Sequence, residues 1–118
     1  MSADNAKTRD AIATFHRLVN QGDYGAIYDA ASVTFKASGS RDQTIGFFSR
    51  INRKMGACQD LSLSVVGYQV NGGGTFVTAN STRRCANGTL GEQFIWQVIN
   101  REPVLIRYNA DNPRLLTD

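Results

Sequence analysis

One side chain in this sequence that could take part in catalysis is a carboxylate among aromatic residues. Glu92 alternates with Phe94 and Trp96, so all three are predicted to face the same side of one strand. A carboxylate in that position can act as a base if it is desolvated and reaches a substrate. The alternative is a cross-strand ion pair with Arg83 or Arg84. We favour the ion pair, because lone carboxylates of this sort are usually structural.

Asp29 and His16 are the other titratable side chains considered for catalysis. Asp29 lies on a predicted short helix whose apolar positions are Ile27, Tyr28 and Ala31, so its carboxylate is expected to face water. His16 lacks the spaced acid and nucleophile of a catalytic triad and is expected at the surface or at a helix edge. The sequence therefore predicts no catalytic residue.

The two cysteines, Cys58 and Cys85, lack the close spacing of a zinc or redox motif. Because the chain has one histidine, no metal site and no cofactor are expected. A disulfide competes with two buried thiols. If residues 71–74 form a hairpin loop, counting back along both strands brings Cys85 opposite Asp60, or opposite Gln59 after a bulge. Cys58 is adjacent, so we favour the disulfide.

Three helices are predicted in the first half of the chain. Apolar residues recur at spacings of three and four over residues 5–21, and Gly22 ends that pattern. A second, short helix with an aromatic face follows. Ser40 and Gln43 have the spacing of a capping box, which predicts a third helix that Gly56 ends.

From Leu61 onward the apolar period changes to two, which is typical of strands with one buried face. The adjacent valines Val65 and Val66, just before Gly67, suggest a β-bulge that bends the first strand. Glycine-containing turns at residues 71–74 and 87–88, and a third turn at residues 101–103, then separate about four strands. The sequence predicts an α+β fold in which three N-terminal helices pack on a curved antiparallel sheet.

Length and composition limit the classes of protein that fit. With 118 residues, 42% hydrophobic and 19% charged, one folded domain spanning residues 1–118 is expected, with flexible ends at 1–4 and 112–118. The net charge is +3, but the basic residues are scattered, so no nucleic-acid partner is expected. No apolar stretch approaches the ~20 residues of a transmembrane helix.

Short segments spread over nearly the whole chain carry a family resemblance. They are Gln21 to Tyr24, Tyr28, Ala30 to Ser32, Phe35, Arg53 to Gly56, Ala86 to Gly88, Glu92 to Val98, and Tyr108 with Asn109. These segments are similar to those of small exported bacterial domains of unknown function, a branch of the nuclear transport factor 2-like superfamily. The resemblance implies a cone-shaped, cystatin-like fold and a periplasmic or secreted protein whose mature part starts near Ser2. The polar run from Asn80 to Arg84 departs from that group.

The resemblance also implies a pocket between sheet and helices, which some members use for catalysis with an acidic base and a tyrosine or a second acid. The matching base candidates here are Glu92 and Asp29, with Tyr24, Tyr28 or Tyr108 as donor. The residues expected to line the cavity are Tyr24, Tyr28, Phe48, Glu92, Phe94, Trp96 and Tyr108.

These observations predict an exported, non-catalytic domain that binds a protein partner or a small apolar ligand. A homodimer through the outer face of the sheet, with Ile95, Ile99 and Leu105 buried there, is also expected. The alternatives are a small-molecule isomerase or hydrolase that uses the cone cavity, and a secretion-system accessory or immunity-type protein.

Overall fold

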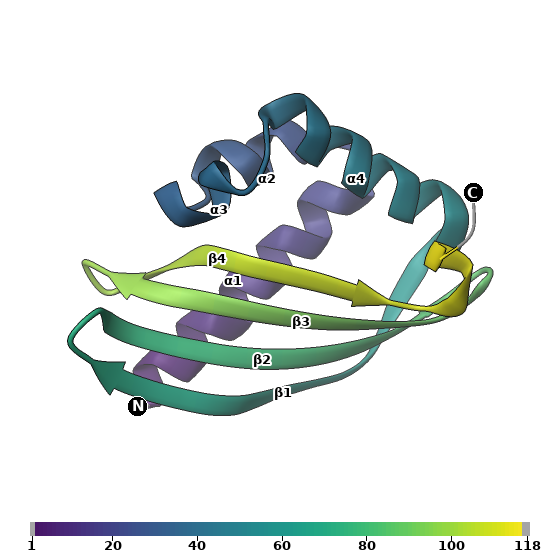
Figure 1. Cartoon of the computed structure of the whole chain (residues 1–118). Coiled ribbons are helices and arrows are strands. Elements are labelled where there is room, and N and C mark those ends of the chain that lie inside the picture. Colours follow the sequence, from purple (N-terminus) through teal and green to yellow (C-terminus); the bar gives the residue numbers. More distant parts are fainter. Residues whose placement is uncertain (1, 117–118) are drawn as a thin grey trace.

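The computed structural model describes residues 2–116, within which helices cover one face of a curved antiparallel sheet (Figure 1). The helices are α1 (Ser2–Asn20), α2 (Tyr24–Ala30), α3 (Val33–Ala37) and α4 (Arg41–Met55). The strands are β1 (Cys58–Asn71), β2 (Gly74–Cys85), β3 (Gly88–Ile99) and β4 (Glu102–Asp111), followed by the 3-10 helix η1 (Pro113–Leu116). The predicted α+β architecture is confirmed, and the short α3 is added to the three predicted helices.

The ends of the helices follow local chemistry. Ser32 caps α3, a helix too short at five residues for apolar periodicity to reveal. The predicted capping box of α4 is present: Ser40 Oγ accepts from the Gln43 N–H, and the Gln43 side chain accepts from the Ser40 N–H. Gly56, with φ +76°, ends α4, and a Cβ there would lie 2.9 Å from the Cβ of Ala86.

The sheet has the order β1-β2-β3-β4, with each neighbouring pair antiparallel. Val70 lies opposite Thr75, as the predicted hairpin requires. The predicted bulge in β1 is confirmed by the register shift between Val65 and Gly67.

A second register shift in β1, between Asp60 and Ser62, was not predicted. Together the two shifts move the pairing by two residues, so Cys58 rather than Asp60 or Gln59 lies opposite Cys85. The predicted disulfide between these cysteines is present, with the sulfur atoms 1.97 Å apart. It joins the open end of the β1–β2 hairpin.

The core lies between the helices and the inner face of the sheet, with α1 running across that face and α2, α3 and α4 beyond the β4 edge (Figure 1). Leu105, predicted on the outer face, is 4% exposed and belongs to this core, so that prediction is wrong. A bulge between Ile95 and Trp96 changes which β4 residues face inward, because Trp96 then pairs with Leu105.

The predicted flexible ends fall partly on regular structure. Residues 2–4 belong to α1 and 113–116 form η1, whereas residues 1, 117 and 118 lie outside the described part of the chain. None of the described helices is both long enough and apolar enough to cross a membrane.

Candidate functional site

Glu92 is the centre of a buried cluster that we call the Glu92 network, formed with His16, Ser81 and Tyr108. Its Oε1 accepts from His16 Nε2 at 2.7 Å and from Ser81 Oγ at 2.7 Å. Its Oε2 accepts from the Tyr108 hydroxyl at 2.6 Å. The second ring nitrogen of His16, Nδ1, lies 3.4 Å from Asp60 Oδ1. One carboxylate therefore joins α1 to strands β2, β3 and β4.

His16 was predicted at the surface or at a helix edge, and that prediction is wrong. Its ring is buried because α1 lies across the inner face of the sheet. His16 follows Ile12 by four residues and so shares its face of the helix, next to Phe15. The spacing from Ile12 could have indicated that His16 faces the core. A search for apolar residues at helical spacing misses it, because histidine is polar.

The predicted ion pair between Glu92 and Arg83 or Arg84 is also wrong. The β2–β3 register places Ser81 opposite Glu92. Arg83 is buried on the same inner face, but its Nε donates to Asp60 Oδ1 on β1 at 2.9 Å. The polar run in β2 is thus partly inward-facing, because the side chains of Ser81 and Arg83 are both buried, with Ser81 bonded to the buried Glu92 and Arg83 to the exposed Asp60.

Burial and hydrogen bonding act in opposite directions on the Glu92 carboxyl. Desolvation raises its pKa, but the hydrogen bond and charge of His16, with the bonds from Tyr108 and Ser81, outweigh burial and lower the pKa below its ordinary value. Burial, followed by the nearby Glu92 charge, raises the pKa of Tyr108 well above its ordinary value. Glu92 is therefore an ionised acceptor and Tyr108 a neutral donor, an arrangement that makes the carboxylate a weak base.

The lowered pKa of Glu92 predicts that acid weakens the fold. When the folded-state pKa lies below the unfolded-state value, the unfolded chain takes up the proton first as pH falls. The stabilisation by Glu92 is full above the ordinary carboxyl pKa of about 4.3 and is lost as pH falls through the lower folded-state value. Urea unfolding from about pH 6 to about pH 3 should show a steeper loss for the wild type than for Glu92→Gln. Equal slopes in the two proteins would contradict this assignment.

The aromatic residues expected to line a cavity are packed against one another in the core. Phe15 contacts Phe94 with ring centroids 5.1 Å apart and Tyr108 at 4.9 Å. Phe48 lies 5.4 Å from Tyr108, and Trp96 stacks on Phe94 at 5.9 Å. These rings fill the space between α1, α4 and the sheet around the Glu92 network.

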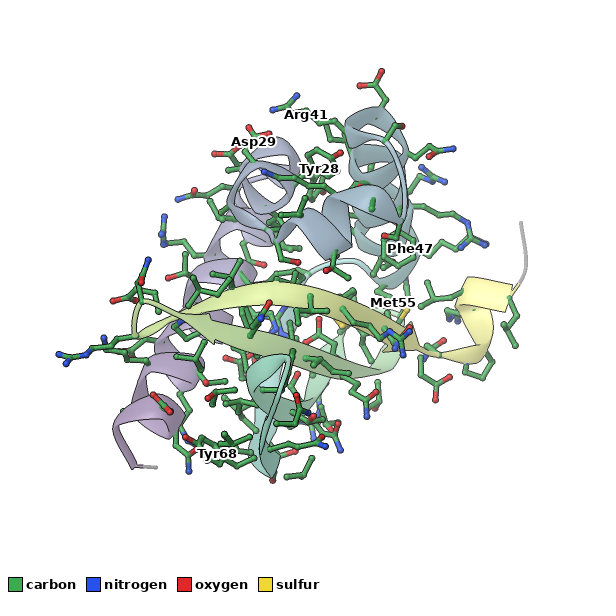
Figure 2. The ribbon with its side chains drawn as sticks, turned by 60° about the vertical axis from the view of Figure 1, so that its left-hand side comes forward. Tyr28, Asp29, Arg41, Phe47, Met55 and Tyr68 are labelled. Atoms are coloured by element: carbon green, nitrogen blue, oxygen red, sulfur yellow. A yellow bond between two sulfur atoms is a disulfide. The ribbon has the colours of Figure 1, made fainter. Side chains whose placement is uncertain are left out.

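The remaining candidates lie on α2, away from Glu92. Tyr24 stacks on Phe48 with centroids 6.3 Å apart, and Tyr28 is half-buried. Asp29 is exposed, as predicted, and accepts two hydrogen bonds from Arg41 at 3.0 and 3.1 Å, at the outer end of the helical layer (Figure 2). The Arg41 hydrogen bond lowers the pKa of Asp29 despite an opposing effect of desolvation. The structure therefore does not bring Asp29 together with Glu92.

A pocket of about 180 Å³ opens between α1, α2 and the β3–β4 hairpin, and we call it the α1–α2 pocket. Of the predicted cavity residues, Trp96 lines it, while Tyr108 lines a separate hollow of about 420 Å³ beside α3 and α4. The walls are small or apolar side chains. The sequence pattern assigned most of them to the buried faces of helices and strands and did not indicate that they border a pocket. They are Ala11, Thr14, Phe15, Leu18, Ile27, Ala30, Ala31, Trp96, Pro103 and Leu105.

Among the described residues, no group of three or more histidine, cysteine, aspartate or glutamate side chains is arranged to hold a metal ion.

No family model matches this chain, and no curated protein is similar to it. A solved structure of an NTF2-like designed protein, Rd1NTF2_05, is similar over 91% of this chain and 98% of its own, with a TM-score of 0.59 and 14% identity. This likeness and the helices on one face of a curved four-stranded sheet show that the described chain has the NTF2-like cone fold.

Proposed function

We propose that this domain binds a small, mainly apolar molecule in the α1–α2 pocket. The observation that carries the proposal is a concave site of about 180 Å³ whose walls are almost wholly apolar. A cavity of ~150 Å³ with similar walls holds benzene, so the volume suits one ring with a small substituent. Thr14 and Ala30 are exposed at the pocket, so a ligand has a way in from solvent.

Binding is better supported than the isomerase or hydrolase alternative. A general base must reach its substrate and needs a pKa near the working pH. Glu92 is buried, accepts hydrogen bonds on both oxygen atoms and has a lowered pKa, while Asp29 is held by Arg41 in solvent. The two carboxylates considered for catalysis are thus engaged in structural contacts.

The first test uses isopropylbenzene as probe. Because a ligand that binds the folded state stabilises it, tenfold excess over Kd should raise the free energy of unfolding by about 1.4 kcal/mol, a few degrees in Tm. Ala30→Phe places a ring at the pocket and should weaken binding about tenfold or more. Thermal unfolding and titration of Trp96 fluorescence measure both effects.

Ala6→Phe is the matched control, because Ala6 is exposed on α1 and is not among the residues that line the pocket. It should bind the probe as the wild type does. If isopropylbenzene fails to bind, or if the two variants lose affinity equally, the pocket is not the binding site.

We also propose that the domain works in a periplasmic or extracellular compartment. The disulfide between Cys58 and Cys85 supports this, since such bonds persist in oxidising surroundings and are rare in reducing ones.

A homodimer through the outer sheet face is a second proposal, supported by a hollow lined by uncharged residues that include Phe76, Ile95 and Ile106. A second copy is the expected occupant, because two chains of net charge +3 can approach most easily at an uncharged surface.

Light scattering should give twice 12.9 kDa for the wild type. Ile95→Lys should give the monomer, while Gln59→Lys, at the far end of β1, should leave the dimer intact.

A further inference from the structure

A second hollow lies beside the α1–α2 pocket, between α1 and the start of β4, and we call it the charged mouth. Its volume is about 320 Å³. The two hollows share the wall residues Ala11, Thr14 and Pro103. The other residues that line the charged mouth are Lys7, Asp10 and Glu102, all of them charged. An apolar hollow is therefore adjacent to a charged one, an arrangement that suits an amphipathic molecule.

The charges of the charged mouth do not cancel. Lys7 Nζ donates to Glu102 Oε1 at 3.1 Å and to the Arg101 carbonyl oxygen at 2.9 Å. Asp10 is exposed, and its carboxylate makes no hydrogen bond or ion pair with the described residues. Two carboxylates and one ammonium group leave a net charge of −1 at the charged mouth, although the chain as a whole carries +3. The charged mouth therefore favours a cation.

The unpaired carboxylate of Asp10 lies close to the boundary between the two hollows. Asp10 and Thr14 are four residues apart on α1, so their side chains are neighbours on one face of the helix, about 6 Å apart along its axis. Thr14 lines both hollows, and its hydroxyl also makes no hydrogen bond with the described residues. A ligand with its apolar part in the α1–α2 pocket can thus reach Thr14 and Asp10 through a short linker.

We propose that the α1–α2 pocket and the charged mouth together bind a one-ring molecule that carries a primary ammonium group on a short linker, with the ring in the pocket and the ammonium at Asp10. This inference rests on the proposed binding function and adds the ligand class. An ammonium group has three N–H donors, which the Asp10 carboxylate and the Thr14 hydroxyl can accept. An anionic ligand is disfavoured, because Lys7, the cation that lines the charged mouth, already donates to Glu102.

The test compares three probes that share a phenylethyl frame and differ in charge. They are 2-phenylethylamine, which is a cation near neutral pH, the neutral propylbenzene and the anion 3-phenylpropanoate. Titration of Trp96 fluorescence and thermal unfolding give their affinities for the wild type. The amine should bind more tightly than the anion, and added salt should narrow that difference, because salt screens exposed charges.

Two variants of the charged mouth should act in opposite directions on the amine. Asp10→Asn should weaken its binding about twofold to fivefold, the range for an exposed ion pair, and should leave propylbenzene binding unchanged. Lys7→Gln should strengthen amine binding, because it releases Glu102 from its ion pair. Asp42→Asn is the matched control: it makes the same change of charge on α4, at a residue that lines neither hollow.

The outcomes separate this inference from the proposed function. If propylbenzene binds but the anion binds more tightly than the amine, the preference for an ammonium group is wrong while the binding function stands. The same conclusion follows if Asp10→Asn and Asp42→Asn have equal effects on amine binding. If none of the three probes binds, the proposed function itself fails.

Discussion

Replacing Glu92 by glutamine is expected to lower the free energy of unfolding by about 3 to 5 kcal/mol. The Glu92 side chain is 2% exposed, and its carboxylate accepts from His16, Ser81 and Tyr108. A glutamine amide has one acceptor oxygen and an NH₂ group, so it places a donor where at least one of these donors needs an acceptor. It also removes the negative charge that strengthens the three hydrogen bonds to this acceptor.

Urea unfolding of both proteins near neutral pH measures this loss, which is a large part of the 5 to 15 kcal/mol typical of a domain. Glu102→Gln is the matched control, because that carboxylate is exposed and pairs only at the surface with Lys7, at 3.1 Å. The control should change stability by no more than about 0.5 kcal/mol. Similar losses in the two variants would mean that the Glu92 network does not hold α1 to the sheet.

Removing the disulfide should cost about 3.5 kcal/mol, the loop-closure estimate for cysteines 27 residues apart. Cys58 begins β1 and Cys85 ends β2, so the bond closes the hairpin at the end opposite its loop. β1 is an edge strand whose neighbour in the sheet is β2, so the bond ties it covalently to the strand with which it pairs.

The measurement is chemical unfolding of the wild type with and without a thiol reductant, beside the double variant Cys58→Ala and Cys85→Ala. The reduced wild type and the double variant should have similar stability, and the reductant should not affect the double variant. A thiol titration shows whether the disulfide has been reduced. If the reduced wild type keeps the same free energy of unfolding, the predicted contribution of the disulfide is wrong.

Several structural features were predictable because they depend on residues close together in the chain. The capping box of Ser40 and Gln43, the end of α4 at Gly56 and the hairpin at residues 71–74 all follow from local backbone requirements. The alternation in β3 likewise placed Glu92 on the same face as Phe94 and Trp96, and the structure has all three buried.

The partners of Glu92 were not predictable in the same way. His16 is 76 residues away in sequence, and its contact depends on how α1 lies across the sheet. Ser81 rather than an arginine lies opposite Glu92 because of the strand register, and a slip of one residue reverses the face of every side chain. The unexpected bulge between Asp60 and Ser62 in β1 shows how readily such counting changes.

The sequence by itself therefore determined the order of helices and strands apart from the short α3, and the shared strand face of Glu92, Phe94 and Trp96, because each depends on local pattern. It favoured the pairing of Cys58 with Cys85, but the register that places them opposite each other depends on two bulges in β1. Only the tertiary structure decided that His16 is buried against Glu92, that Leu105 faces the helices, and that a pocket remains beside Trp96. The physical reason is that these features depend on the relative placement of surfaces distant in sequence. A pocket is the small volume that remains between such surfaces, and local patterns carry no measure of it.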